Sequence, residues 1–208
     1  MMINKKYGVS YEMSQVMINY INCLKNKSLL KKGIAIFNSK LLDIDFIDDL
    51  YKIAISKIDK SPNSLHLYGN SKIVPVNIKE TLISLFSPFI NEYFGMDYTK
   101  KMLLFHDFSV HYGKNYDKKL ITHVDDSDIT INICLKNNLL KTELEFTGIV
   151  DTLFSNQNSF ENFLINLEQG DILIHRGNHP HKVNQISTID LKNDESERVN
   201  AILWFKYV

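Results

Sequence analysis

Residues 123–135 read HVDDSDITINICL, and from Ile129 onward apolar and polar side chains alternate. A period of two is typical of a β-strand with one face on a hydrophobic core. Similar short segments, rich in β-branched and aromatic residues, follow through the second half of the chain: LLFHDFSVHY (103–112), LITHV (120–124), ELEFTG (143–148), FLINL (163–167), DILIHR (171–176) and VNAILWFKYV (199–208). About six to eight short strands at this spacing predict a β-sandwich or barrel.

The first half of the chain carries mainly helical patterns, with apolar residues two to four positions apart. The predicted elements are, in order, a helix from Ser10 to Leu24, a strand over 33–42, a helix from Asp43 or Asp45 to Ile58, and a helix that Asn77 caps and Gly95 ends. We therefore expect a single α+β domain over residues 1–208, with helical support from residues 1–100 and a β-barrel over residues 101–208.

The composition argues against several classes of protein. The 24 basic and 24 acidic residues cancel, so no uniform electrostatic field attracts nucleic acid or anionic lipid. The two cysteines do not form a disulfide framework. The N-terminus lacks the apolar stretch of a secretory signal, and the chain has no uninterrupted apolar run long enough for a membrane span. We expect a cytoplasmic protein without a nucleic-acid or membrane partner.

Two groups of histidines suggest a metal site. His123 and Asp125 are two residues apart, so on an extended backbone both side chains point to one side and can bind one ion. The segment DILIHRGNHPHKV (171–183) adds His175, His179 and His181, one of which would complete two imidazoles and one carboxylate. This set suits non-haem Fe(II), because it leaves coordination positions open. The ordinary alternatives are a surface turn for the first pair and a solvated loop for the second group.

Arginine is scarce in this chain, which has only Arg176 and Arg198. Arg198 opens the last predicted strand, whose alternation places Arg198, Asn200, Ile202 and Trp204 on one face. A guanidinium on a barrel strand is costly unless it meets a carboxylate, which its planar fork can bind through two hydrogen bonds. The alternative is an arginine that reaches solvent or pairs with Glu195 or Glu197.

The order of these motifs resembles a known superfamily. HVDDSDITINICL, ELEF, GDILIHRGNHPHKV and RVNAILW follow one another as in the catalytic domain of the Fe(II)- and 2-oxoglutarate-dependent dioxygenases. The pattern is most similar to the procollagen-lysine (lysyl hydroxylase) and prolyl hydroxylase-like branch, and it covers about residues 100–208. The resemblance implies a double-stranded β-helix, the jelly-roll or cupin-like barrel, buttressed by the N-terminal helices.

The resemblance also implies roles for individual residues. His123, Asp125 and His181 would be the metal ligands, although His179 and His181 share strand parity and spacing alone does not choose between them. His179 would then line the site, and His175 would pack on its strand. The 2-oxoglutarate contacts implied are the anchor Arg198 for its distal carboxylate, with Asn132, Thr130 and Tyr112 beside it. Because the polar stretch STIDLKNDESE (187–197) lengthens the connection before Arg198, Lys182 or Lys206 stays open as an alternative anchor.

The function implied is hydroxylation of an unactivated C–H, with succinate and CO2 as co-products. The cofactors would be Fe(II), 2-oxoglutarate and O2, with ascorbate as a further reductant. The expected substrate is a lysyl or prolyl residue in a protein or peptide, and substrate recognition is expected from residues 113–119 and 151–163. A free amino acid or other small molecule is the alternative substrate, and a non-catalytic cupin-like metal-binding module is the alternative function.

Overall fold

The structure is a computed structural model, and it describes residues 20, 22–30, 32–56, 72–95, 99–140, 142–150, 161–192 and 194–208. The helix predicted from Ser10 lies almost entirely outside the described residues, and so does most of the expected recognition segment 151–163. Within the described residues, no helix has the length and apolar character needed to cross a membrane.

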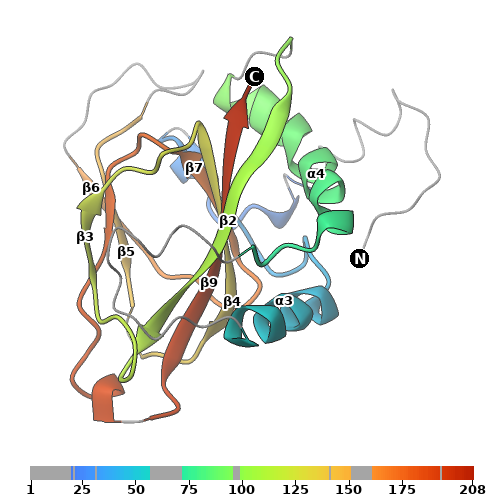
Figure 1. Cartoon of the computed structure of the whole chain (residues 1–208). Helices are drawn as coiled ribbons and strands as arrows, with labels where there is room; N and C mark the ends of the chain where they lie inside the picture. Colours follow the sequence, from blue (N-terminus) through green and yellow to red (C-terminus); the bar gives the residue numbers. More distant parts are fainter. Residues whose placement is uncertain are drawn as a thin grey trace.

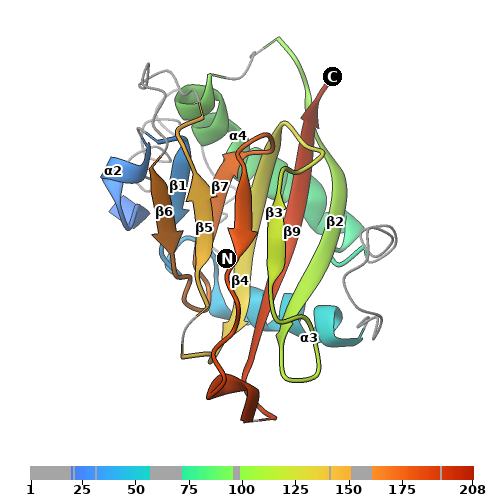
Figure 2. The ribbon, with the colours of Figure 1, turned by 90° about the vertical axis from the view of Figure 1, so that its left-hand side faces the viewer.

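Two antiparallel sheets face each other, as Figures 1 and 2 show. The five-stranded sheet has the order β1 (Ile34–Phe37), β7 (Ile172–Arg176), β4 (Ile129–Asn137), β9 (Glu197–Tyr207), β2 (Met102–Gly113). The four-stranded sheet has the order β3 (Leu120–His123), β8 (His181–Val183), β5 (Leu144–Thr147), β6 (Asn162–Ile165). This arrangement confirms the β-sandwich or barrel that the strand patterns predict, and it agrees with the double-stranded β-helix, or jelly roll, that the resemblance implies. The short strand β8 was not among the predicted segments.

Helices cover the outer face of the five-stranded sheet (Figure 1). α3 (Ile44–Ser56) and α4 (Val76–Phe94) bury apolar residues against the outward side chains of β4, which are Ile129, Ile131, Ile133 and Leu135. Gly95 ends α4 in the left-handed conformation at φ 61°, as predicted. The predicted cap at Asn77 is wrong, because α4 begins one residue earlier and Pro75 occupies the N-cap position without a side-chain hydrogen bond. Two shorter helical elements are α2 (Lys27–Leu30) and the 3-10 turn η2 (Asp190–Lys192).

The other face of this sheet looks into the space between the sheets. A second cluster of buried side chains fills this space, and its members include Phe108, Cys134, Phe146 and Leu173. β9 divides as its alternation predicts: Val199, Ala201, Leu203 and Phe205 pack toward the helices, whereas Ile202 and Trp204 face the second cluster. The barrel therefore has a dry outer core under the helices and an inner face that carries the polar residues.

Three bulges interrupt the pairing of the described strands, and the one on β3 lies next to the candidate site residue His123. They fall between Leu104 and His106 on β2, between Leu120 and His123 on β3, and between Cys134 and Lys136 on β4. On β2 the consequence is visible in the packing, because Leu104 joins the helix-side cluster while His106 contacts Phe108 and Trp204. A regular strand would place residues two apart on the same face.

A buried carboxylate joins the helical layer to the barrel. Asp107 on β2 is 2% exposed, accepts a hydrogen bond from the Val74 amide at 2.8 Å and forms an ion pair with Lys79 at 3.0 Å. The contact ties the start of α4 to the edge strand of the sheet.

Replacing this carboxylate should destabilise the fold. We expect Asp107→Ala to lower the free energy of unfolding by about 3 kcal/mol, because it leaves a buried amide and a largely buried ammonium without their partner. The matched control is Asp49→Ala, which removes an exposed ion pair with Lys52 and should cost less than about 0.5 kcal/mol. Urea unfolding measures both values, and equal losses in the two variants would contradict the role of Asp107.

Candidate metal and cosubstrate site

Three of the predicted ligands meet at the barrel interior. His123 at the end of β3 and His181 at the start of β8 are register partners, and Asp125 follows β3. One ligand atom from each of the three residues lies within 4.8 Å of the others. The Oδ1 atom of Asp125 is 3.6 Å from His123 Nε2 and 3.9 Å from His181 Nε2. Two imidazole nitrogens and one carboxylate oxygen therefore converge on one point.

Backbone carbonyls orient both imidazoles. His123 Nδ1 lies 2.9 Å from the Ile121 carbonyl oxygen, and His181 Nδ1 lies 2.9 Å from the His179 carbonyl oxygen. Since a carbonyl only accepts, each Nδ1 carries a proton, so the atom left to bind a metal in each ring is the Nε2 atom that lies toward Asp125. Burial lowers the pKa of His181, although the neighbouring Asp125 opposes this effect, so the neutral form that binds a metal is favoured.

The carboxylate of Asp125 is held by a chain of hydroxyl groups. Thr130 donates to Asp125 Oδ2 at 2.5 Å, and the Ser127 hydroxyl lies 2.8 Å from the Thr130 oxygen. Because the single proton of Thr130 goes to the carboxylate, Ser127 must be the donor in the second contact. Oδ2 is thereby occupied by the protein, and Oδ1 is the oxygen that faces the imidazoles. The Thr130 hydroxyl was predicted to lie beside 2-oxoglutarate, but in the structure it donates its proton to Asp125.

A close contact between two turns sets the distance between the ligand segments. The Asp125 amide donates to the Gly177 carbonyl at 2.8 Å, and the Gly177 amide donates to the Asp128 carbonyl at 3.1 Å. A Cβ atom on residue 177 would lie 1.9 Å from the Ser127 carbonyl oxygen. Only glycine permits this approach, so the turn after β7 fits directly against the turn that carries Asp125.

The other two histidines have separate roles. His175 on β7 is buried, as predicted, with its Nε2 atom 3.8 Å from Asp125 Oδ2, and burial lowers its pKa well below the usual value. His179 Nε2 donates to the Gly148 carbonyl at 3.0 Å, and burial lowers the pKa of His179 to about 4. His179 lies against Phe146 and outside the group of three, although its Nδ1 atom has no partner among the described residues.

The two arginines also differ. Arg176 donates to the carbonyl oxygen of Phe94, which joins β7 to the end of α4. Arg198 is 1% exposed and makes one hydrogen bond, at 3.2 Å to the Thr142 carbonyl, while its guanidinium lies 4.8 Å from the centre of the Tyr112 ring. Its Nε atom has no partner, and no carboxylate of the described residues lies within ion-pair distance. The alternative in which Arg198 pairs with Glu195 or Glu197 is therefore wrong.

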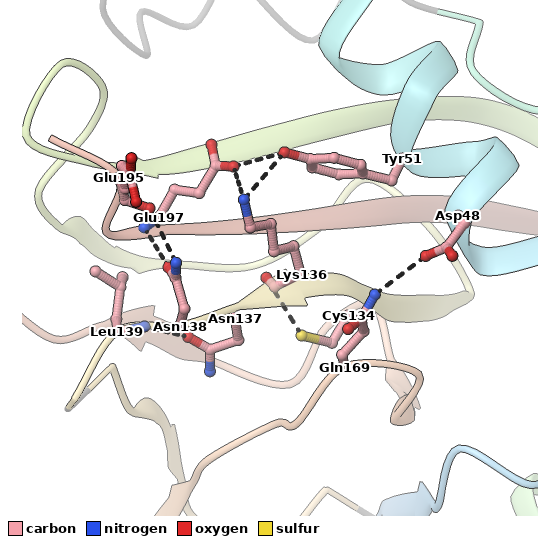
Figure 3. A network of polar contacts seen from close by, with 10 residues as sticks. All are labelled: Asp48, Tyr51, Cys134, Lys136, Asn137, Asn138, Leu139, Gln169, Glu195 and Glu197. Atoms are coloured by element: carbon pink, nitrogen blue, oxygen red, sulfur yellow. Dashed lines mark hydrogen bonds and ion pairs between the residues drawn. The ribbon is translucent and has the colours of Figure 1, made fainter. Parts of the chain in front are cut away.

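Neighbouring contacts fix Arg198 in this inward position. Figure 3 shows Glu197 with Tyr51 and Lys136, from which its carboxylate accepts hydrogen bonds at 2.6 Å and 2.7 Å. Although partial burial raises the pKa of Glu197, these two hydrogen bonds hold it below the usual value. The Asn138 side chain accepts from the Glu197 amide at 2.7 Å, which fixes the start of β9 despite the long preceding loop.

The alternative anchors are occupied on the surface. Lys182 pairs with Glu145 at 3.0 Å, and Lys206 pairs with Asp126 at 2.9 Å. Lys182 and His181 are adjacent on β8, so their side chains point to opposite faces. The exposure and pairing of both ammonium groups favour Arg198 as the anchor.

Polar residues connect Arg198 with the metal ligands along the inner face. Asn132 on β4 is 6% exposed, and Asn200 on β9 donates to its side-chain oxygen at 2.6 Å. On β9, Trp204 pairs with Thr130 and Arg198 pairs with Tyr112. Asn200 therefore lies between the Arg198 end of the strand and the end beside Thr130, whose hydroxyl holds Asp125. The alternation put Asn200 on this face, but no motif gave it a role.

The donor atoms fit Fe(II) and a dicarboxylate. Two imidazole nitrogens and one carboxylate that is fixed by hydrogen bonds form the donor set expected for non-haem Fe(II). The buried guanidinium of Arg198 lies on the same inner face and has no carboxylate partner among the described residues, so it fits the far end of 2-oxoglutarate. The loop 113–119, which was expected to recognise substrate, lies away from His123. It begins beside Glu197 at the end of β2 and leads into the start of β3, whereas His123 is the last residue of β3.

The hydroxyl of Thr130 gives a test of the ligand geometry. We expect Thr130→Val, which keeps the shape of the side chain, to weaken Fe(II) or Co(II) binding about tenfold, because Asp125 loses its orienting donor. Thr130→Ser keeps a hydroxyl and should bind the metal nearly as the parent protein does. Calorimetric titration under anaerobic conditions measures both affinities, and unchanged binding by Thr130→Val would show that the hydrogen bond is dispensable.

The choice between His181 and His179 can be tested with matched substitutions. His181→Gln should reduce Fe(II) affinity by at least about a hundredfold, because one of three ligands is lost. His179→Gln keeps a donor for the Gly148 carbonyl and should change the affinity less than about threefold. The same titration compares the two variants. A larger loss in His179→Gln would reverse the assignment.

Comparisons with known proteins agree with this geometry. No family model matches the chain. Two curated proteins of Arabidopsis thaliana are similar: the 2-oxoglutarate and iron-dependent oxygenase domain-containing proteins CP2, with 35% identity over 104 residues, and ICU11, with 33% over 101 residues. Each match spans 48% of this chain and 24% of the relative, so the chain corresponds to about a quarter of the length of these proteins.

Solved structures with the same fold are more distant in sequence. A 2OG-Fe(II) oxygenase family oxidoreductase from Burkholderia pseudomallei has a TM-score of 0.58 at 12% identity and covers 97% of this chain and 91% of its own. A prolyl hydroxylase from Trichoplax adhaerens, in complex with a hypoxia inducible factor peptide, has a TM-score of 0.58 at 15% identity, covering 97% and 95%. The chain therefore has the double-stranded β-helix of the Fe(II)- and 2-oxoglutarate-dependent oxygenases, and the resemblance to that superfamily is confirmed.

Proposed function

We propose that this protein is an Fe(II)- and 2-oxoglutarate-dependent oxygenase that hydroxylates an unactivated C–H bond, with succinate and CO2 as co-products. The observation that carries the proposal is the buried Arg198, which faces the same interior as the ligand group and has no carboxylate partner among the described residues. A structural or surface arginine would have been paired or solvated.

In this proposal each residue has a defined task. His123, Asp125 and His181 would hold Fe(II), and Arg198 would bind the distal carboxylate of 2-oxoglutarate. Fe(II) and 2-oxoglutarate together supply the activation of O2 that places one oxygen atom in the substrate C–H bond. The remaining inward residues assigned to the cosubstrate are Asn132, as a donor beside it, and Tyr112, whose ring lies against the guanidinium. Thr130 acts indirectly, because its hydroxyl holds Asp125.

The protein also shields the site. Phe146 is fully buried and stacks on His181 with ring centres 5.1 Å apart, and His175 closes the space behind Asp125. Displacing water from this interior strengthens the interaction of Arg198 with an anion.

Ascorbate would restore Fe(II) after an unproductive cycle. Residues 1–208 would act as one catalytic domain.

The substrate we propose is a lysyl or prolyl residue in a protein or peptide. Support comes from similarity in fold to the Trichoplax prolyl hydroxylase and to a Pseudomonas putida prolyl-4-hydroxylase with a TM-score of 0.54. The same fold also occurs in SnoN and SnoK, an epimerase and a carbocyclase from nogalamycin biosynthesis. A free amino acid or another small molecule is therefore the second candidate. Incubating Fe(II), 2-oxoglutarate and O2 with peptide and small-molecule libraries, with detection of substrate-dependent succinate, separates the two.

Substituting the anchor tests the reaction class. The protein with Fe(II) and 2-oxoglutarate under anaerobic conditions should show the weak visible absorption band of the metal–cosubstrate complex. We expect Arg198→Met to weaken 2-oxoglutarate binding by at least about a hundredfold, since the buried fork that pairs with the carboxylate is lost. The same variant should be as stable as the parent protein or more stable without ligands, because an unpaired buried charge is removed.

Two outcomes would contradict the proposal. Fe(II) binding without any 2-oxoglutarate binding by the parent protein would favour the non-catalytic metal-binding module. Unchanged 2-oxoglutarate affinity in Arg198→Met would show that the guanidinium is not the anchor. Thermal unfolding with and without 2-oxoglutarate provides the stability comparison.

A further inference from the structure

Asn200 has no task in the mechanism so far, yet it is fully buried on the inner face of the barrel. It lies on β9 two residues after Arg198, between Val110 on β2 and Cys134 on β4. A primary amide in such surroundings is costly, because its donors and its acceptor must leave water. An apolar residue would fill the same place without that cost, so the amide requires an explanation.

The side chain of Asn200 makes one hydrogen bond, and its direction matters. Its Nδ2 atom donates to Asn132 Oδ1 at 2.6 Å. Its own Oδ1 atom is buried and has no partner among the described residues. The positive charge of Arg198 on the same face favours this orientation, since it attracts the carbonyl oxygen and repels the amino group.

The contact determines which end of the Asn132 amide stays available. With its oxygen occupied, Asn132 keeps its Nδ2 atom, which has no bond to a described residue and is not sealed from solvent. In the opposite orientation, Asn132 would donate to Asn200 and turn its oxygen toward the interior. A carboxylate only accepts hydrogen bonds, so it is attracted by the first orientation and repelled by the second.

We infer that Asn200 is a positioning residue, which holds the Asn132 amide with its donor group toward the 2-oxoglutarate site. Arg198 and Asn132 then present only hydrogen-bond donors to the dicarboxylate, and Asn200 acts through Asn132 without touching the ligand. The inference rests on the proposed function, because it assigns a ligand to the space beside Arg198.

A double-mutant cycle tests the inference. Asn132→Leu, Asn200→Leu and the double variant are titrated with 2-oxoglutarate in the presence of Fe(II) under anaerobic conditions, with the visible absorption band as the readout. Each single substitution should weaken 2-oxoglutarate binding about tenfold, the effect of one hydrogen bond to a charged group. The double variant should bind within about twofold of Asn132→Leu, because Asn200 has nothing left to orient.

Metal binding provides the control, because a substitution that merely disturbed the barrel would also weaken Fe(II) binding. Trp204 is the only tryptophan of the chain and lies opposite Thr130, so quenching of its fluorescence by Fe(II) reports the metal alone. The Fe(II) affinity should stay unchanged in all three variants. If Asn200→Leu does not fold, Asn200→Ala replaces it in the cycle, with the same expectation.

The results separate this inference from the proposed function. Additive losses in the double variant, or no loss of 2-oxoglutarate affinity in Asn200→Leu, would overturn the positioning role while leaving the reaction class intact. Failure of the parent protein to bind 2-oxoglutarate would overturn both. Loss of Fe(II) affinity in Asn200→Leu would also overturn the inference, because it would mean that the substitution disturbs the whole barrel.

Discussion

The buried positive charge of Arg198 is the constraint on which the inner face of the barrel depends. Moving a guanidinium out of water costs several kcal/mol, and neither the Thr142 carbonyl nor the Tyr112 ring compensates as a carboxylate would. The surrounding contacts keep the charge inward: Glu197 is drawn away by Tyr51 and Lys136, and the backbone of β9 is fixed by Asn138. The fold thus carries an unfavourable charge that lowers its stability without a ligand and that the anionic ligand proposed above would relieve.

Much of the fold follows from alternation along the strands. The period of two in residues 129–135 predicts a β-strand with one face on a hydrophobic core, and in the structure the isoleucines of β4 pack under the helices. The faces of β9 were predicted correctly for the same reason. Strand parity alone does not select the candidate metal ligand, because His179 and His181 share the same parity. In the structure His181 joins the group with His123 and Asp125, whereas His179 contacts Gly148, a residue distant in sequence.

Bulges mark where sequence patterns stop being sufficient. Each inserts one residue, which reverses the alternation, and the three bulges lie beside His106, His123 and Arg198. The strand β8 has three residues, too few for a periodic signal. The placement of loop 113–119 away from His123 depends on the register of β2 with β9, which a single sequence does not encode locally. The pairing of Asn132 with Asn200 is likewise a contact between strands.

The fit between Gly177 and Ser127 has a consequence for how the site opens. Two backbone hydrogen bonds join the turn after β7 to the turn after β3, and the space between them is too small for any Cβ. Local opening of either turn must break both hydrogen bonds. Asp125 and the segment that leads to His181 therefore open and close in one step. The ligand group therefore behaves as one cooperative unit, in which a partly assembled site with two ligands is poorly populated. Amides at Asp125 and Gly177 should accordingly exchange their hydrogens at a common rate.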